Sequence, residues 1–310
     1  LDAYLDHSLF AVPLPHEAPD HSTVLPGLQP EEAAVLAFLK QRSAQHGVFP
    51  MTSPTANAGR RARITAITSG KGGVGKTFLS ANLATALARQ GEKVLVLDAD
   101  LGLANLDVVL NLFPKITLHD VFTGKHTLDE AILETGGGFS VLLAGSGMVE
   151  YSRLTPEVRE QLTDVIRQVV PRFDRILLDT GAGISDVVLY TVSLADEVLI
   201  VATPEPTSLT DAYATIKVLA TTQNRRDIRV LVNQVSKPGE GRIIRGQLQQ
   251  VVDRFVSPGL EVPVKLEFVG EVPIDPSVRD AVKKRQLLLD CLPGSAAAQA
   301  VVAAATRLRA

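Results

Sequence analysis

Residues 70–77 constrain the fold of this chain more than any other stretch. They read Gly-Lys-Gly-Gly-Val-Gly-Lys-Thr and match the phosphate-binding loop pattern G-x-x-x-x-G-K-[ST]. A short apolar run, residues 64–68, precedes the loop, and residues 78–89 follow it with leucines at four-residue spacing. The flanking runs predict a strand and a helix, which is the setting that such a loop requires.

The residue types of this loop suit a bound phosphate group. Glycines let the backbone curl so that successive N–H groups point at one anion, and the positive end of the following helix adds to the attraction. Lys76 can reach the β- and γ-phosphates, and the Thr77 hydroxyl can ligate Mg²⁺. The predicted nucleotide-binding residues of the loop are Gly70, Lys71, Gly72, Gly73, Val74, Gly75, Lys76, Thr77 and Phe78.

Composition limits the classes of protein that fit. The 310 residues are 45% hydrophobic, enough for one large α/β domain with an appendage. A net charge of −3 gives no global electrostatic case for nucleic acid. The single cysteine, Cys291, excludes a disulfide framework and an iron–sulfur ATPase with paired cysteines, and it fits a reducing cytoplasm. We see neither a secretory signal nor a membrane-spanning run, so we expect a cytoplasmic protein.

The chain divides near residue 62. Residues 1–62 form a proline-rich extension that holds four of the six histidines, in which Pro30 precedes a predicted short helix over residues 31–45. This extension is either a linker or docking peptide, or an ordered strap packed on the main domain. The histidines are irregularly spaced and predict no metal site.

Residues 63–310 form the predicted main domain. Further apolar runs recur at residues 94–97, 141–143, 176–178, 198–201, 230–232 and 266–269, with helix-like segments between many of them. This alternation predicts a mostly parallel central sheet with helices on both faces, and ligands then bind beyond the carboxyl ends of the strands. The terminal stretch, residues 296–309, is alanine-rich and lacks lysines and bulky apolar residues, so we expect it to close the domain rather than bind a membrane.

Carboxylates follow two of the predicted strands. Asp98 and Asp100 end the run at 94–97, and their spacing of two places both side chains on one side. Two unpaired buried carboxylates would cost several kcal/mol, so they need a cation or waters. The alternative is a pair of loop aspartates that cap the next segment. Asp179 ends the run at 176–178 in the arrangement that holds Mg²⁺ through water, and Gly181 and Gly183 form a hinge beside it. The predicted metal site comprises Thr77, Asp98 and Asp179.

Several of these segments resemble one family. An additional lysine near the start of the loop, Lys71, gives the loop the form of the deviant Walker A motif of the MinD/ParA ATPases. The segments Asp-Ala-Asp-Leu-Gly-Leu-Ala-Asn-Leu-Asp (98–107), Asp-Thr-Gly-Ala-Gly-Ile (179–184) and Pro-Glu-Pro-Thr-Ser-Leu-Thr-Asp-Ala-Tyr (204–213) are similar to those of its flagellar-number regulators (FlhG, also called FleN). The resemblance covers residues 63–309.

The resemblance implies roles for three catalytic residues: Lys71, Lys76 and Asp100. In this family the early lysine crosses a dimer interface to the partner's nucleotide, and the second aspartate orients the hydrolytic water. For Lys71 the alternative is a solvated loop lysine. The resemblance also implies adenine contacts from Asn233 and from the loop of Pro273 and Asp275; an Asn amide suits adenine and favours ATP over GTP. Strand-end polar residues that face water are the alternative.

The implied function is an ATP-dependent dimerising switch that hydrolyses ATP to ADP and phosphate, with Mg²⁺, and controls the number or placement of flagella. Implied partners are flagellar switch proteins, a signal-recognition-type GTPase or a transcriptional activator, and recruitment to the membrane or cell pole stays open. The Asp-Gln-Ala-x-x-Leu-Arg segment that such regulators often carry near the N-terminus is not present in residues 1–62.

Two other functions stay open from the sequence. A partition-type ATPase would bind DNA nonspecifically through a basic dimer face, for which the candidates are Arg225, Arg226, Arg229, Arg242 and Arg245. A non-catalytic scaffold would act through residues 1–62. The intact Lys76, Asp100 and Asp179 argue against the scaffold.

Overall fold

The computed structural model describes residues 61–101, 105–145 and 154–310. The proline-rich extension and its predicted helix over residues 31–45 therefore lie outside the described residues, apart from Arg61 and Ala62. The predicted boundary at residue 62 stays a prediction.

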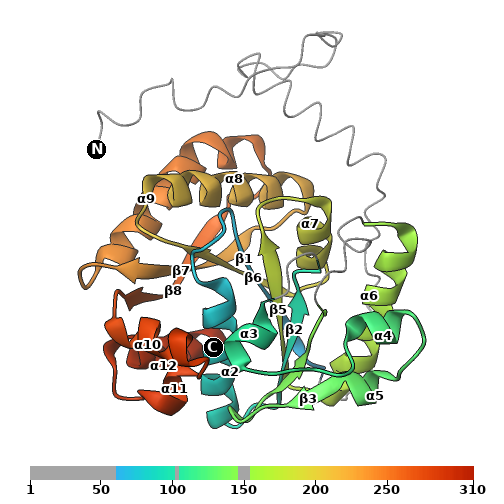
Figure 1. The fold of residues 1–310 in the computed structure, drawn as a ribbon. Helices are drawn as coiled ribbons and strands as arrows, with labels where there is room; N and C mark the ends of the chain where they lie inside the picture. The colour runs from blue at the N-terminus through green and yellow to red at the C-terminus, as the bar shows by residue number, and fades with distance from the viewer. Residues whose placement is uncertain (1–60, 102–104, 146–153) are drawn as a thin grey trace. The chain divides into compact units, whose positions relative to one another are not determined.

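The described residues form one eight-stranded sheet with the order β3-β4-β2-β5-β1-β6-β7-β8 (Figure 1). All neighbouring strands pair in parallel except β3 and β4, which are antiparallel. The mostly parallel sheet is the predicted one; the three-residue edge strand β3 is an addition. The strands are β1 (Arg63–Ser69), β2 (Val94–Ala99), β3 (Ile132–Glu134), β4 (Ser140–Leu142), β5 (Arg175–Ala182), β6 (Glu197–Ala202), β7 (Asp227–Val235) and β8 (Lys265–Pro273).

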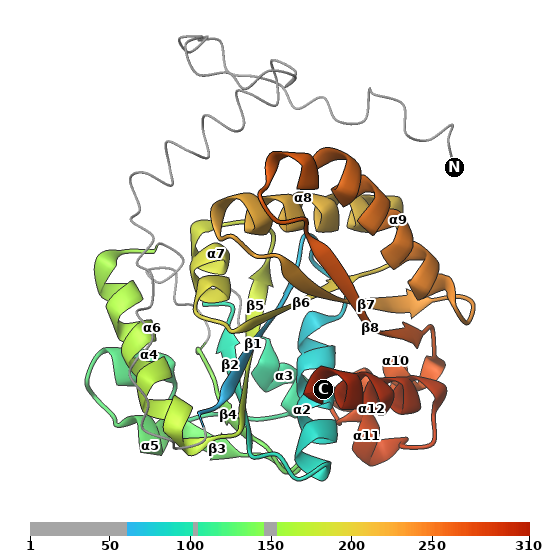
Figure 2. The ribbon, with the colours of Figure 1, turned by 180° about the vertical axis from the view of Figure 1, so that it is seen from behind.

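Helices cover both faces of the sheet, as predicted. Figures 1 and 2 show α8 and α9 on one side and α2, α10 and α12 on the other. The helices of the described residues are α2 (Lys76–Arg89), α3 (Leu106–Leu110), α4 (Leu118–Phe122), α5 (Leu128–Ala131), α6 (Pro156–Val169), α7 (Asp186–Ser193), α8 (Pro206–Thr222), α9 (Glu240–Phe255), α10 (Pro276–Lys284), α11 (Leu288–Cys291) and α12 (Ala296–Arg309).

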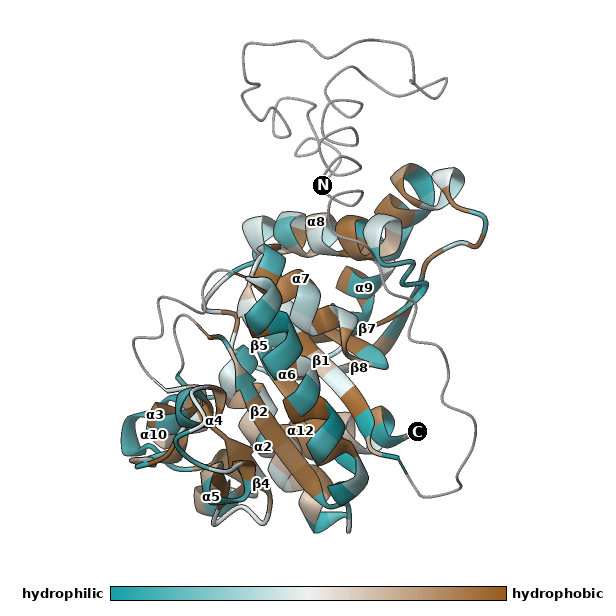
Figure 3. Ribbon diagram, turned by 90° about the vertical axis from the view of Figure 1, so that its right-hand side faces the viewer, coloured by the Kyte–Doolittle hydropathy of each residue, from teal (hydrophilic) through white to brown (hydrophobic). Residues whose placement is uncertain are grey.

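The two faces of the sheet belong to two separate hydrophobic clusters. In β2, Leu95 and Leu97 face the cluster that includes α6 to α9, whereas Val94 and Val96 face the cluster that includes α2 and α12. This alternation follows from the two-residue period of a strand. Because both faces are covered, the strands read as continuous apolar runs, and Figure 3 shows hydrophobic residues concentrated in them.

Helix α12 closes the second face, as the sequence predicts. Ala297, Val301, Ala304 and Leu308 are among its fully buried residues, and the helix packs on α2 and β8. Its small side chains let it approach closely: a Cβ added at Gly270 in β8 would lie 3.1 Å from the Cβ of Ala304. Among the described residues, no helix has both the length and the apolar character needed to cross a bilayer.

Charged residues gather near the amino ends of the central strands. The Arg175 guanidinium, 3% exposed, donates to Glu92 at 2.8 Å and lies 3.6 Å from Glu197. Arg229 also bonds Glu197, at 3.2 Å, and donates to the Leu308 carbonyl at 2.7 Å. This network joins β5, β6 and β7 to the end of α12. It lies at the amino ends of the strands, whereas the phosphate loop lies at their carboxyl ends.

Candidate functional site

The phosphate loop, residues 70–75, joins β1 to α2. Gly73 and Gly75 have φ angles of +79° and +95°, which residues with a side chain rarely adopt. Gly70 is required for a different reason. A Cβ added there would lie 2.2 Å from the backbone carbon and oxygen of Asp211, so the loop is pressed against α8.

Lys76 begins helix α2 and is buried, with 9% of its surface exposed. Its Nζ donates to the Ser69 hydroxyl at 3.0 Å, and that hydroxyl donates to the Lys71 carbonyl at 2.7 Å. Burial lowers the pKa of Lys76, while the negative charges of Asp179 and Asp100 act in the opposite direction. The ammonium therefore lies between the loop backbone and the carboxylates, where a phosphate would meet it.

Asp98 and Asp179 lie directly opposite each other on the neighbouring strands β2 and β5, and both are at most 2% exposed. Burial raises the pKa of Asp179 to about 6, and it raises the pKa of Asp98 well above the usual range. The hydroxyls of Ser80 (2.8 Å) and Thr77 bond to Asp179 and lower its pKa in part. Two buried carboxylates beside hydroxyls form an all-oxygen donor set that suits Mg²⁺, and their excess negative charge fits a cation.

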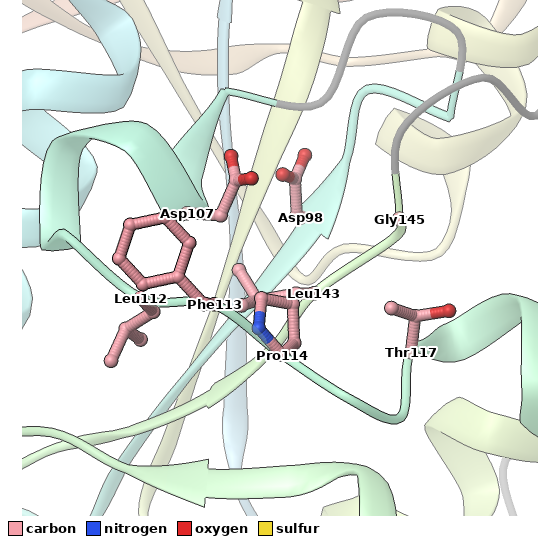
Figure 4. Close-up of a pocket in the computed structure, with 8 residues that line it drawn as sticks. All are labelled: Asp98, Asp107, Leu112, Phe113, Pro114, Thr117, Leu143 and Gly145. Atoms are coloured by element: carbon pink, nitrogen blue, oxygen red, sulfur yellow. The ribbon is translucent and has the colours of Figure 1, made fainter.

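The Asp98 carboxylate also fixes the segment that follows β2. It accepts the backbone N–H groups of Asp100 at 3.2 Å and of Leu106, the first residue of α3, at 3.4 Å. Beside it lies a hollow of about 230 Å³, which the sequence did not predict and which Figure 4 shows. Its lining residues are Asp98, Asp107, Leu112, Phe113, Pro114, Thr117, Leu143 and Gly145. Residues 102–104, within the segment 98–107 that resembles the flagellar-number regulators, lie outside the described residues.

Asp100 meets the hinge that follows β5. A Cβ added at Gly181 would lie 3.3 Å from the Asp100 carboxylate, so the absence of a side chain leaves room for that group. Gly183, with a φ of +87°, donates its N–H to the Ser69 carbonyl at 2.8 Å. The structure thus brings Asp100 and the predicted hinge against the base of the phosphate loop.

Lys71 is held within its own chain. Its Nζ lies 2.8 Å from Glu205 Oε2 and 3.0 Å from Thr207 Oγ1. Because the Lys71 and Glu205 side chains are 38% and 61% exposed, the role across a dimer interface and the solvated-lysine alternative both stay predictions. Helix α8 begins at Pro206 with Glu205 as its N-cap residue, and the Ser208 hydroxyl accepts the Thr203 N–H.

The predicted base-contacting residues lie at the carboxyl ends of β7 and β8. Asn233 is 7% exposed, and its side chain donates to the Val74 carbonyl of the phosphate loop at 2.8 Å. The Asp275 carboxylate accepts the N–H groups of Ser277 at 2.8 Å and Ala297 at 3.0 Å, which lower its pKa. The Asp275 carboxylate thereby caps α10 and also hydrogen-bonds to the first turn of α12. The adenine contacts of Asn233, Pro273 and Asp275 stay predictions.

The sequence analysis did not identify three polar residues of the site, which are Ser80, Ser69 and Glu205. Ser80 lies one helical turn after Thr77, but the same helix also carries Asn82 and Thr85, so nothing in the sequence distinguished the Ser80 hydroxyl. Ser69 directly precedes the glycine-rich pattern. Glu205 gave no signal, because only tertiary contact brings it to Lys71 across more than 130 residues.

The arginines proposed for a basic face are largely engaged inside the chain. Arg225 donates to the carbonyls of Val192 at 3.0 Å and Ala195 at 2.6 Å. Arg226 donates to the Ala220 carbonyl at 2.6 Å. Together with Arg229 in the charged network, these contacts give three of the five arginines structural roles.

A glycine-rich loop between a strand and a buried helix, faced by buried carboxylates from two neighbouring strands, defines a phosphate-loop nucleotide-binding domain of the α/β class. The chain belongs to the CobQ/CobB/MinD/ParA nucleotide-binding domain family, whose model matches residues 65–289. The predicted resemblance to MinD/ParA-type ATPases near the flagellar-number regulators is therefore confirmed.

Comparison with individual relatives shows which members of the family this chain is similar to. The chain is 43% identical to the antiactivator FleN of Pseudomonas aeruginosa over 246 residues, 79% of this chain and 86% of that protein. It is 34% identical to the flagellum site-determining protein YlxH of Helicobacter pylori over 237 residues, 76% of this chain and 78% of that one. The septum site-determining protein MinD of Pyrococcus horikoshii, solved with Mg-ADP, is 28% identical with a TM-score of 0.61, covering 80% of this chain and 96% of that one.

Proposed function

We propose that this protein is an ATP-dependent dimerising switch that hydrolyses ATP to ADP and phosphate and controls the number or placement of flagella through partner proteins. The convergence of Lys76, Thr77, Asp98, Asp100 and Asp179 at the carboxyl ends of β1, β2 and β5 carries the hydrolytic part of this proposal. The similarity to FleN and YlxH supports the flagellar part.

Different site residues bind the phosphates, the base and the metal ion, and orient the attacking water. The backbone of residues 70–76 and the Lys76 ammonium bind the phosphates, and the adenine lies toward Asn233, Pro273 and Asp275. Thr77, Asp98 and Asp179 would hold Mg²⁺, which would neutralise part of the phosphate charge. Asp100 accepts a hydrogen bond from the attacking water and orients it. Its position against Gly181 lets the loop after β5 respond to the γ-phosphate.

Dimerisation turns this site into a switch. Lys71 exchanges its contact with Glu205 for the nucleotide of the second subunit, where its charge stabilises the transition state. The exchange is energetically easy because Lys71 and Glu205 are 38% and 61% exposed, and an ion pair that accessible contributes at most about 1 kcal/mol. Hydrolysis then removes the γ-phosphate and opens the dimer.

Light scattering and phosphate release test the switch directly. We expect a monomer with ADP, a transient dimer with Mg-ATP, and a persistent dimer with Mg-ATP for Asp100→Ala, which retains the binding residues but releases no phosphate. Lys76→Ala should neither bind ATP nor dimerise. A parent protein that stays monomeric with ATP under all conditions would contradict the switch, whatever its rate of hydrolysis.

The flagellar output is tested in a cell. Partners of the three predicted classes are flagellar switch proteins, a signal-recognition-type GTPase and a transcriptional activator; the name of FleN, an antiactivator, favours the last. Deletion of the gene should change the number or position of flagella, and Asp100→Ala should fail to restore the normal pattern. Normal flagella after deletion would redirect the search to another cargo.

A further inference from the structure

Asn233 is the only predicted base-contacting residue whose side chain hydrogen-bonds to the phosphate loop within the described residues. Its Nδ2 donates to the Val74 carbonyl at 2.8 Å, across 159 positions of sequence. Its Oδ1 accepts the backbone N–H of Gln234 at 2.9 Å. Both ends of the amide are thus fixed, and the residue is 7% exposed.

Local backbone geometry is adapted to this contact. Gln234 has a φ of +60°, which is uncommon for a residue with a side chain, and the β7–β8 pairing shifts register between Asn233 and Val235. On the loop side, a Cβ added at Gly75 would lie 2.5 Å from Asn233 Nδ2. This glycine of the motif therefore makes room for the Asn233 amide as well as for the helix start.

The hydrogen-bonding capacity of the amide is only half used. A carboxamide has two N–H donors and two acceptor lone pairs, and the two internal bonds take one of each. One donor and one acceptor remain, which is the pair that the edge of an adenine requires. A base and the phosphate loop can therefore engage the same side chain simultaneously.

We propose that Asn233 is a positioning residue that holds the phosphate loop in its binding conformation through Val74 and so couples recognition of the base to binding of the phosphates. This inference rests on the proposed nucleotide-binding function but goes beyond a base contact. Its consequence is that removal of the amide weakens binding of a ligand that has no base at all.

The test compares base-free and complete ligands on the full chain. Affinities of Mg-tripolyphosphate, ATP and GTP are measured by calorimetry for the parent, Asn233→Ala and Asn233→Asp. The aspartate keeps the size and the acceptor for Gln234 but has no donor for Val74. Loss of one hydrogen bond to a buried carbonyl predicts that both variants bind Mg-tripolyphosphate at least about fivefold more weakly than the parent.

Hydrogen exchange of the ligand-free proteins adds a second measurement. The amides of residues 70–76 should exchange faster in both variants, while the helices of the domain keep their protection. Where the alanine variant does not fold, the exchange rates of ligand-free Asn233→Asp decide, because its added carboxylate by itself repels tripolyphosphate. Any loss for ATP beyond that for tripolyphosphate measures the contact with the base.

Unchanged tripolyphosphate affinity in both variants, with ATP binding weakened, would overturn the coupling and leave Asn233 as a base contact only. Unchanged affinity for every ligand would overturn it as well. A parent protein that binds neither ATP nor tripolyphosphate would instead refute the proposed function, so the two failures are distinguishable.

Discussion

Replacement of Asp179 by asparagine should stabilise the ligand-free protein while it removes function. Burial raises the pKa of Asp179 to about 6 from 3.8, so the folded state disfavours the carboxylate that the unfolded state carries. Since each pKa unit corresponds to about 1.4 kcal/mol, the ionised group costs roughly 3 kcal/mol of folding stability at neutral pH. The introduced carboxamide is neutral at every pH and retains an oxygen that accepts the Ser80 hydroxyl.

The sign of the pH dependence follows from the same shift. Well below pH 3.8 the carboxyl is neutral in both states, so there the substitution changes little. As the pH rises from the unfolded pKa of 3.8 to the folded pKa of about 6, the parent loses stability, and above that range the cost is constant. Loss of the charge near Lys76 offsets part of the gain, so we expect a net stabilisation of about 1 to 3 kcal/mol at neutral pH.

Urea unfolding in EDTA without nucleotide measures this effect. Asp179→Asn should have the higher midpoint at about pH 7.5, and the difference should fall to roughly half at about pH 5 because the carboxyl is then largely protonated in the folded state. Asp280→Asn, on an exposed site of α10, is the matched control and should change little at either pH. A midpoint at or below that of the parent at neutral pH, or a gain independent of pH, would refute the reasoning.

Three further substitutions test other contacts. Glu205→Gln releases Lys71 from an accessible ion pair, so light scattering should show ATP-dependent dimerisation tightened by no more than about fivefold, with stability unchanged; a weaker dimer would argue that Glu205 acts in the dimer itself. Gly70→Ala places a methyl group against the backbone of α8 and should destabilise the fold by about 1 to 3 kcal/mol in thermal unfolding and lower nucleotide affinity; parental affinity would contradict the close packing. Arg175→Met leaves the half of the network around Glu92 without its buried partner, and urea unfolding should show a loss of about 3 kcal/mol, with nucleotide affinity unchanged at a temperature where the variant is folded.

Sequence patterns were sufficient for the architecture. Seven apolar runs predicted seven of the eight strands, because buried parallel strands are apolar on both faces and therefore continuous in sequence. The phosphate loop was equally clear, since its glycines and its Lys-Thr pair are required by local chemistry. The edge strand β3 was missed because a three-residue strand with partly exposed residues has no distinctive pattern.

The start of α8 shows where local signals compete. Thr207 and Ser208 are good capping residues, yet Pro206 occupies the first helical position and sets the boundary earlier in the chain. Because they do not cap the helix, the two hydroxyls make other contacts: Thr207 accepts a hydrogen bond from Lys71, and Ser208 accepts one from the Thr203 N–H. Sequence spacing could not distinguish these uses, because both place a hydroxyl near a helix start.

The sequence by itself determined the class of fold, the phosphate loop and the three aspartates that end two strands, because each depends on periodicity or on residue types required within a few positions. Only the tertiary structure decided how these parts are coupled. It placed Lys71 on Glu205, Ser80 on Asp179 and the Asn233 amide on the phosphate loop. Those contacts join segments that are far apart along the chain, and their geometry follows from sheet order and helix packing rather than from any local pattern.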